Sequence, residues 1–281
     1  MPVPPATGAH RRRSVLLLTG VAVICVLVPF LGWHQTWFGR RLSDREIDRY
    51  LRDDRHPRRI QHALSQISDR IADGDEITGS WSPQIVALSR HPMPAIRATS
   101  AWVMGQDNGS TSFRFALIEL LRDPELMVRR NAALSLVRFG DREGRAELVR
   151  ILQPYVVHAT SGGNVSIRVK GEQDVGAGTL LARIRAEHGP EIDIRSPFSG
   201  RVHAVIARDG SRVAPGAQIV SLAPESGQIW EALRGLYLVG QAEDLSEVDR
   251  YQHADAPERI RRQATLTAQA IRSRSARKAS P

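Results

Sequence analysis

Apolar residues run without a charge from Ser14 to Trp33, close to the N-terminus. A helix of about 20 residues, at about 1.5 Å per residue, can cross the ~30 Å hydrocarbon core of a bilayer. Arginines precede this run and aromatic residues, including Trp37, follow it, as expected at the two membrane interfaces. We therefore predict a basic N-terminal tail over residues 1–13 and a transmembrane anchor over residues 14–38.

A cleavable signal peptide is the alternative interpretation of this run. Signal peptides have a shorter apolar region, of about 7–15 residues, and small residues before the cleavage point. Here the run ends in Pro29 to Trp33 without that pattern, and Cys25 does not follow the small residues of a lipoprotein cleavage site. The arginines beside the short tail favour a cytoplasmic N-terminus, so we expect a single-pass bacterial inner-membrane protein with a periplasmic body.

Two segments after the anchor repeat one apolar pattern. Each has a helical run, a turn that contains a proline, and a second helical run with apolar residues three and four positions apart. Proline suits the turn because it lacks an N–H donor and fixes φ, so it ends one helix and starts the next. The equivalent residues are Leu88 and Leu120, Pro92 and Pro124, Ile96 and Val128, and Ala101 and Ala133.

This pattern resembles the HEAT repeat, in which a helix and a D-P turn precede a helix of the form V-R-x-x-A-x-x-x-L. One helix pair cannot bury its apolar stripe alone, so neighbouring pairs are expected to stack. We predict HEAT-like helical repeats over residues 42–154, in which 59–71 is a divergent or capping unit. The resemblance implies an extended surface that binds a protein or a peptide.

The array is expected to resume near the C-terminus. There, Ile260–Leu266 repeats the pattern of Val128–Leu134. We predict returning HEAT-like helices over residues 225–272 and a disordered basic tail over 273–281.

Arginine recurs at one position of the repeats, as Arg97, Arg129 and Arg261. Such arginines can bind neighbouring carboxylates or the carbonyl groups at helix ends. We interpret all three as structural residues rather than as parts of a functional site.

Between residues 155 and 224 the apolar pattern changes from helical to alternating, which predicts strands. The segment Ser196–Pro224 resembles the second half of the biotinyl/lipoyl domain, a barrel-sandwich hybrid shared with periplasmic membrane fusion proteins. A weaker first half repeats the second with one extra residue before the valine. The matched residues are Gly171 and Gly210, Val175 and Val213, Gly178 and Gly216, and Leu181 and Ile219.

Carrier proteins of that family hold their prosthetic group on a lysine at the tip of the hairpin between the halves. Here that position is Gly189, and the domain's only lysine, Lys170, lies away from the hairpin. Without the amine that is acylated, the resemblance implies no biotin or lipoate, and we expect no cofactor. The hairpin also lacks the coiled-coil insertion of periplasmic adaptors. Its tip, His188, Gly189 and Pro190, is a candidate docking site that we expect to be a plain turn.

The composition is typical of a folded protein, with 42% hydrophobic and 25% charged residues. The formal net charge of +9 comes almost wholly from arginines, which are interspersed with acidic residues along most of the chain. No nucleic-acid motif accompanies them, so we expect no nucleic-acid partner. Cys25 is the only cysteine, which excludes a disulfide within the chain and a cysteine-based metal site.

Residue spacing reveals no catalytic or metal-binding constellation. The nine histidines form no H-E-x-x-H motif, and we interpret His188 and His203 as ordinary polar residues rather than ligands. The glycine-valine pattern of the strands also resembles lysostaphin-type zinc endopeptidases, but their H-x-x-x-D and H-x-H motifs are missing. No P-loop, dinucleotide fingerprint or nucleophile elbow is found. We expect no metal, no catalytic residue and no small-molecule substrate.

Together these patterns predict an α+β multidomain protein. A transmembrane helix leads into a HEAT-like α-solenoid, and a small all-β lipoyl-like domain is inserted before a C-terminal helical unit. The expected function is that of a membrane-anchored, non-catalytic scaffold that binds partner proteins in the bacterial envelope. The alternative, from a different class, is a short-range periplasmic adaptor subunit of a transporter.

Overall fold

The computed structural model describes residues 41–186, 189–253 and 255–279. These belong to two units, one over residues 1–49 and the other over 50–281.

The predicted basic tail and transmembrane anchor, residues 1–13 and 14–38, lie outside the described residues. Among the residues that are described, no helix is both long enough and apolar enough to span a bilayer. Most of helix α2 (Asp44–Leu51) belongs to the first unit.

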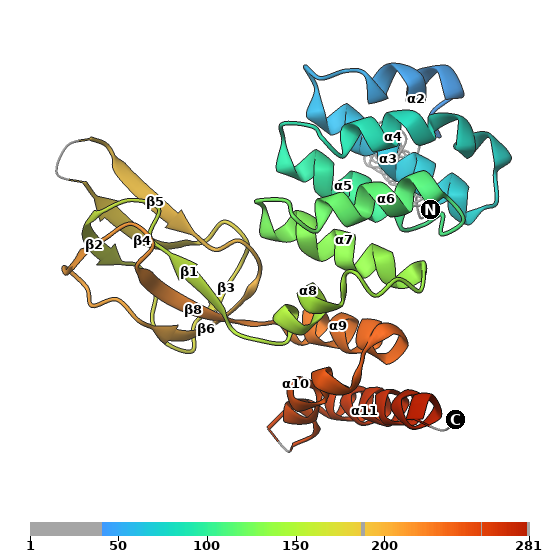
Figure 1. Cartoon of the computed structure of the whole chain (residues 1–281). Coiled ribbons are helices and arrows are strands. Elements are labelled where there is room, and N and C mark those ends of the chain that lie inside the picture. The colour runs from blue at the N-terminus through green and yellow to red at the C-terminus, as the bar shows by residue number, and fades with distance from the viewer. Residues whose placement is uncertain (1–40, 187–188, 254, 280–281) are drawn as a thin grey trace, which may run out of the picture. The chain divides into compact units, whose positions relative to one another are not determined.

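The second unit begins with helices that pack side by side in chain order (Figure 1). Proline occupies the first turn of α3, α4 and α5, and the Ser110 hydroxyl accepts a hydrogen bond from the N–H of Phe113 at the start of α6. The helices are α3 (Pro57–Ala72), the 3-10 helix η1 (Glu76–Trp81), α4 (Ser82–Leu88), α5 (Pro94–Met104), α6 (Thr111–Leu120), α7 (Leu126–Arg138) and α8 (Arg145–Ile151). Helical repeats are therefore confirmed in this part of the chain.

After these helices, the described residues form eight strands in two four-stranded sheets, in the orders β1-β8-β6-β3 and β5-β4-β2-β7. All their pairings are antiparallel. The strands are β1 (Tyr155–His158), β2 (Gly163–Ile167), β3 (Asp174–Val175), β4 (Leu180–Arg185), β5 (Glu191–Arg195), β6 (Gly200–Val205), β7 (Arg212–Val213) and β8 (Gln218–Pro224). Helical repeats and small antiparallel sheets together confirm the α+β class. We call residues 155–224 the β-domain.

The strands β1 to β4 and β5 to β8 are equivalent halves of the β-domain. When each strand is replaced by its equivalent in the other half, the order β1-β8-β6-β3 becomes β5-β4-β2-β7. Gly178 and Gly216 hold equivalent turns, both with φ +81°. The predicted match of Gly171 to Gly210 is wrong by one residue. Glu172, with φ +61°, takes the place of Gly210, with φ +74°, and no extra residue precedes the valine. Sequence comparison paired the two glycines, whereas the left-handed backbone conformation is the feature that repeats.

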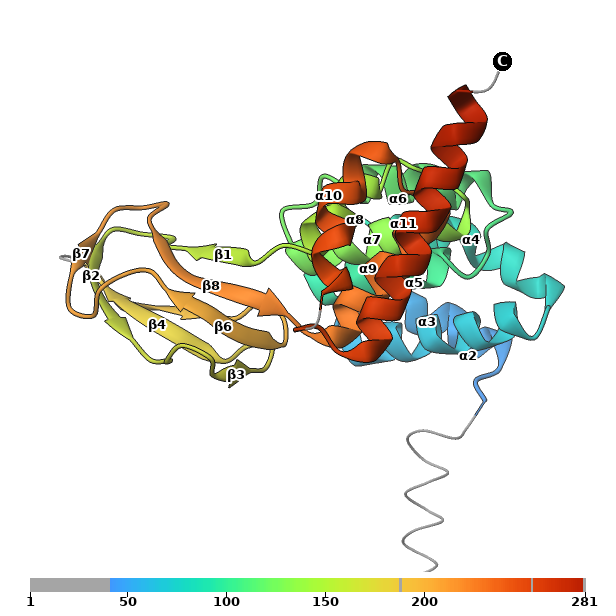
Figure 2. The same cartoon turned by 90° about the horizontal axis from the view of Figure 1, so that it is seen from below.

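The chain returns to helices directly after the last strand. Figures 1 and 2 both show α11 alongside α9. The elements are α9 (Ser226–Val239), η2 (Ala242–Asp244), α10 (Leu245–Asp249), η3 (Arg250–Gln252) and α11 (Glu258–Ala279). One apolar core joins residues before the β-domain, such as Leu148 of α8, to residues after it, such as Leu233 of α9. The helical array is therefore continuous in space across the inserted β-domain.

The prediction of a disordered tail from residue 273 is wrong, because α11 continues to Ala279. The guanidinium of Arg274 donates hydrogen bonds to the carbonyl oxygens of Tyr237 and Gly240, at the end of α9. These bonds and the complete burial of Ile271 hold the second half of α11 against α9. Arg274 therefore belongs to the helical part of the chain, where its charge complements the carboxyl end of α9.

Candidate protein-binding groove

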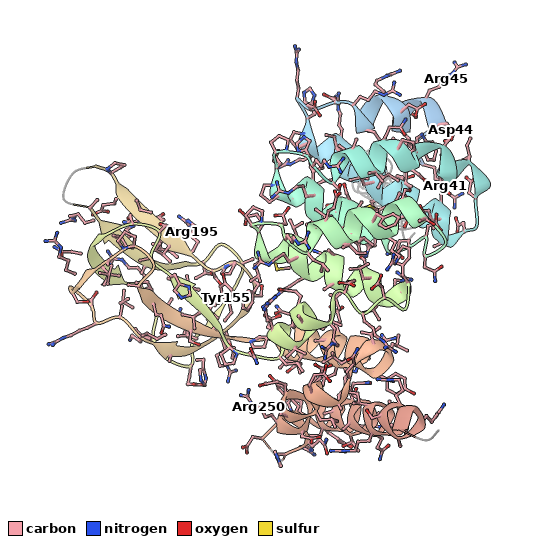
Figure 3. All side chains as sticks on the ribbon, in the orientation of Figure 1. Arg41, Asp44, Arg45, Tyr155, Arg195 and Arg250 are labelled. Atoms are coloured by element: carbon pink, nitrogen blue, oxygen red, sulfur yellow. The ribbon has the colours of Figure 1, made fainter. Side chains whose placement is uncertain are left out.

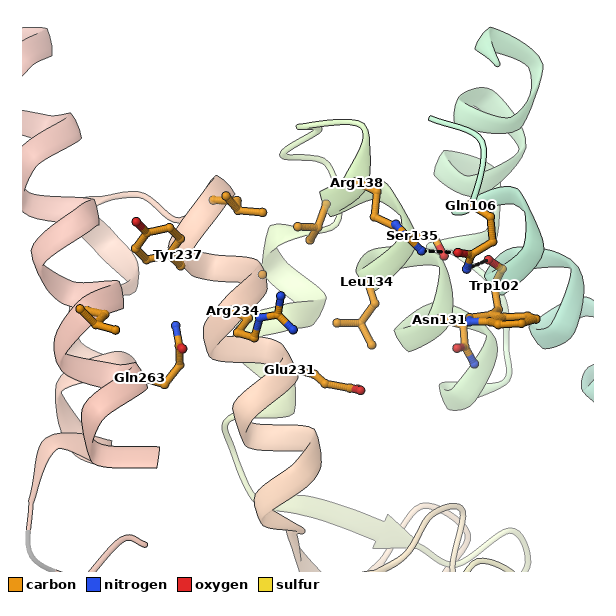
Figure 4. Close-up of a pocket in the computed structure, with 14 residues that line it drawn as sticks. Trp102, Gln106, Asn131, Leu134, Ser135, Arg138, Glu231, Arg234, Tyr237 and Gln263 are labelled. Carbon is orange, nitrogen blue, oxygen red and sulfur yellow. Dashed lines mark hydrogen bonds between the residues drawn. The ribbon is translucent and has the colours of Figure 1, made fainter. Parts of the chain in front are cut away.

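Helices α5, α7, α9 and α11 line an open groove of about 760 Å³ (Figure 4). In Figure 4, α5 and α7 lie on one side and α9 and α11 on the other. The lining residues are Trp102, Gln106, Asn131, Leu134, Ser135, Val137, Arg138, Glu231, Arg234, Gly235, Tyr237, Leu238, Gln263 and Leu266.

Buried hydroxyl groups tie the helices together on each side of the groove. Ser135 of α7 donates through Oγ to the carbonyl oxygen of Ala101 in α5 at 2.8 Å. Thr267 of α11 donates through Oγ1 to the carbonyl oxygen of Leu233 in α9 at 2.9 Å. Both walls are thus helix pairs held in a fixed register, which favours a preformed binding surface.

A close helix approach closes the base of the groove. Gly235 of α9 lies against α7 and α8, so that a Cβ placed on it would come within 2.9 Å of Leu148 and 3.2 Å of Val137. A side chain on this residue would push against the buried Leu148 and Val137 side chains, so glycine favours this close approach. Gly235 therefore sets the depth of the groove between α7 and α9.

Helix α9 carries both buried and exposed apolar side chains. One face is buried in the array core and includes Leu233 and Leu236, both at 0% exposure. Tyr237, four residues after Leu233, lies at the edge of that face and is 42% exposed. Leu238 lies outside it and is 57% exposed, and both residues line the groove. Exposed apolar side chains that line one groove indicate a surface that a partner covers.

Apolar side chains from the other helices extend this surface. Trp102 of α5 is 42% exposed and Leu266 of α11 is 43% exposed, and both line the groove. Leu134 of α7, which is half-buried, also lines the groove, and Figure 4 shows it between Trp102 and Arg234. The array thus gathers exposed aromatic and aliphatic groups from α5, α9 and α11, with half-buried Leu134 of α7, into one concave surface.

Positive charge dominates the ionisable residues of the lining, which are Arg138, Arg234 and Glu231. The Arg138 guanidinium donates to the Gln106 side-chain oxygen, and that of Arg234 lies 4.6 Å from the ring centroid of Trp230. Within the described part of the chain, no carboxylate forms an ion pair with either arginine. Both can therefore pair with acidic groups of a ligand.

The predicted structural arginines lie outside the groove. Arg97, Arg129 and Arg261 each donate a hydrogen bond to a carbonyl of the turn before their own helix. Arg97 also binds the Asp123 carboxylate of the next repeat with two bonds, of 2.7 and 2.8 Å. Burial disfavours the charge of Asp123, but the bonds from Arg97 and from the Glu125 N–H outweigh it and hold the pKa of Asp123 below its ordinary value.

A second polar cluster joins the β-domain to the helices on either side of the insertion. Arg130 of α7, only 4% exposed, lies 4.3 Å above the ring centroid of Phe198 in the β-domain. It also donates to the Gln228 side-chain oxygen of α9 at 3.1 Å, and Gln228 donates to the Ser199 carbonyl oxygen at 2.9 Å. Burial lowers the pKa of Arg130 to about 10, so it stays charged at neutral pH.

Phe198 also secures the entry to the β-domain. Tyr155, labelled in Figure 3, opens the first strand and packs edge-on against Phe198 with ring centroids 5.8 Å apart. Phe198 is 2% exposed and belongs to the β-domain core. Sequence reasoning used this segment only for its glycine spacing and did not single out its phenylalanine or Arg130.

The candidate docking tip lies in the connection between β4 and β5. Gly189 and Pro190 are exposed there, and Gly189 adopts φ +132° with open space around it. His188 lies outside the described residues. Over the residues that are described, no group of three or more histidine, cysteine, aspartate or glutamate side chains could hold a metal ion.

Comparison with known proteins identifies HEAT repeats over residues 82–158, which confirms the predicted repeat type for this segment. No curated protein matches the chain. Among solved structures, a single-chain, multi-domain long-chain acyl-CoA carboxylase matches with 17% identity and a TM-score of 0.25. The match covers 34% of this chain and 10% of the carboxylase chain, so this chain spans only a small part of that protein.

The groove residues were not predicted as a site. The available signal was in the run Trp230–Gly240, where Leu238 lies outside the three-and-four stripe that packs into the core and Tyr237 lies at the edge of that stripe. An apolar residue outside the core stripe of a helix is a reason to look for a partner surface. Which helices complete that surface could not be read from spacing.

Proposed function

We propose that the chain is a membrane-anchored, non-catalytic scaffold that binds a partner protein in the groove between α7 and α9. The observation that carries the proposal is the gathering of exposed Trp102, Tyr237 and Leu238 in one concave surface. Aromatic residues are enriched at the energetic centres of interfaces, and a contiguous exposed apolar patch marks an interaction site. Helical repeats present such surfaces to proteins and peptides.

The β-domain serves this scaffold as a packing or docking module of the biotinyl/lipoyl type. Two four-stranded sheets built from equivalent halves support that resemblance. Glycine at the hairpin tip, Gly189, supports a role without a prosthetic group. Arg130 and Gln228, which hold the β-domain, come from α7 and α9, the same helices that face each other across the groove. A ligand in the groove and the position of the β-domain are therefore linked through two shared helices.

The apolar run from Ser14 to Trp33 supports an inner-membrane anchor, and its flanking arginines support a periplasmic body. The alternative function is a short-range adaptor subunit of a transporter, which the resemblance of the β-domain to membrane fusion proteins favours. The two differ in what co-purifies with the intact chain from membranes. Recovery of an ABC or proton-driven transporter would favour the adaptor.

Site-specific photo-crosslinking tests the scaffold proposal. A benzophenone amino acid replaces Tyr237 in the full-length chain, expressed in its own host. The matched control carries it at Phe115 of α6, which is 59% exposed but does not line the groove. We expect a discrete protein adduct from position 237 and none from position 115. No protein adduct from 237, or the same adducts from both positions, would contradict binding in the groove.

A further inference from the structure

Resting on the proposed function, we infer that the groove takes an acidic amphipathic segment of its partner protein, with aliphatic or aromatic side chains on one face and carboxylates beside them. The groove combines exposed apolar side chains with positive charge. Its apolar side chains select an apolar ligand face, and its arginines, which form no ion pair within the described residues, select negative charge next to that face.

The exposed apolar groups of the groove favour a ligand with an apolar face. Trp102 and Leu134 line the α5–α7 wall, Leu238 lines the groove from α9, and Tyr237 lies on the side of α9 that faces α11. An open surface with apolar groups from several helices suits a helix or an extended segment that presents one apolar face. A ligand without apolar groups would leave these side chains in water.

The arginines of the groove account for its expected preference for acidic groups. Arg138 and Arg234 lie in the lining, and within the described residues neither pairs with a carboxylate. Just beyond the end of α9, the guanidinium of Arg274 binds the Tyr237 carbonyl, and the positive charge of Arg142 acts on it. With Glu231 as the one carboxylate among the described lining residues, Arg138 and Arg234 leave the groove with an excess of positive charge, which complements an acidic ligand and speeds its association.

The same charge argues against two other occupants. A second copy of the chain carries the same net charge of +9, so association through this basic surface opposes like charges. The chain's own N-terminal segment contains an uncharged apolar run flanked by arginines, among them residues 11–13, and offers no carboxylates to the groove.

Peptide binding to the full-length chain in detergent tests the inference. The probe is a fluorescent helical peptide with leucines on one face and glutamates beside them, and its counterpart has lysine at every glutamate. We expect the acidic peptide to bind and the basic one not to bind, with an affinity that falls as salt rises. The double variant Arg138→Glu/Arg234→Glu should weaken the acidic peptide about tenfold. The control Arg122→Glu/Arg208→Glu makes the same charge change at exposed positions outside the groove and should have no effect.

The outcomes separate the inference from the proposed function. If the arginine variants bind the acidic peptide as well as the unaltered chain does, or if both peptides bind equally, the acidic preference is wrong. The scaffold proposal then still stands, provided that crosslinks from position 237 reach a partner protein. The sequence of that crosslinked segment gives a second readout: a stretch rich in carboxylates supports the inference, and a basic stretch, a lipid, a second copy or the chain's own N-terminus overturns it. Variants are compared only after their circular dichroism spectra and melting temperatures match those of the unaltered chain. Leu238→Gln changes an exposed apolar residue of the same groove and should also weaken binding of the acidic peptide.

Discussion

Replacing Asp123 with asparagine tests how much the ion pair between neighbouring repeats stabilises the array. The Asp123 carboxylate accepts two hydrogen bonds from Arg97, and the two side chains are 6% and 12% exposed. Asparagine keeps the shape but removes the charge and turns one acceptor into a donor that faces the guanidinium. Breaking a buried pair by removing one partner costs about 3–5 kcal/mol. Because Arg97 keeps its bond to the His91 carbonyl, we expect a loss of about 2–3 kcal/mol in the free energy of unfolding.

The pH dependence of the free energy of unfolding provides a second, independent test of this ion pair. The pKa of Asp123 is lower in the folded chain than in the unfolded chain, so the pair stabilises fully above about pH 4 and loses its contribution as pH falls through the folded pKa. The difference between the unaltered chain and Asp123→Asn should therefore be constant near neutral pH and shrink in acid.

Chemical denaturation of the full-length chain in detergent, followed by circular dichroism between about pH 3 and pH 8, measures both effects. The matched control is Asp255→Asn. Asp255 is exposed and precedes Arg261 by the same interval as Asp123 precedes Arg129, so its replacement should change the free energy of unfolding by less than about 0.5 kcal/mol. A loss at Asp123 no larger than this, or one that persists unchanged in acid, would refute the reasoning.

Three further substitutions have expected outcomes. Glu172→Gly should stabilise the β-domain by up to about 1 kcal/mol in thermal melts, because glycine adopts the left-handed backbone conformation without steric strain. Gly210→Ala at the equivalent turn should destabilise it by about 1–2 kcal/mol for the opposite reason. Changes of the same sign for both variants would contradict the equivalence of the halves. Gly105→Ala should destabilise the array by about 1–3 kcal/mol in chemical denaturation, since the new Cβ would lie 2.5 Å from Ser135 Oγ. An unchanged midpoint of unfolding would mean that α5 and α7 can move apart without cost. Pro190→Lys at the exposed hairpin tip should leave partner recovery in pull-downs unchanged, because a short turn offers little contact area; a severalfold loss with the fold intact would make the tip a docking site.

The groove and the β-domain junction use the same two helices, and the position of the insertion explains why. The chain leaves the array after α8 and returns at α9, so α7 and α9 become neighbours although the β-domain separates them in sequence. At one end of this pair Arg130 and Gln228 hold the β-domain. At the other end the side chains of Tyr237 and Arg138 face the groove. A partner in the groove therefore contacts the helix pair that also sets the attachment of the β-domain.

Local periodicity was enough to predict the helical repeats, since a helix pair with proline in its turn and an apolar stripe has few other ways to bury that stripe. Alternation likewise predicted strands after residue 155. The equivalence of the turns at Glu172 and Gly210 was harder to predict. A residue other than glycine can adopt the left-handed conformation when neighbouring hydrogen bonds hold it, as Glu172 does. The end of α11 was also missed, because the bonds from Arg274 to the carbonyl groups of α9 are tertiary contacts that the local pattern does not reveal.

The sequence by itself determined the classes of element along the chain, the absence of a lysine at the hairpin tip, and the apolar run that predicts an anchor. These properties depend on residue type and short-range spacing alone. Only the tertiary structure decided that helices on both sides of the β-domain share one core, that Arg97 reaches Asp123 in the next repeat, and that Trp102, Leu134 and Tyr237 line one groove. Such contacts join residues far apart in the sequence, and they depend on how successive helix pairs stack, which no local pattern specifies.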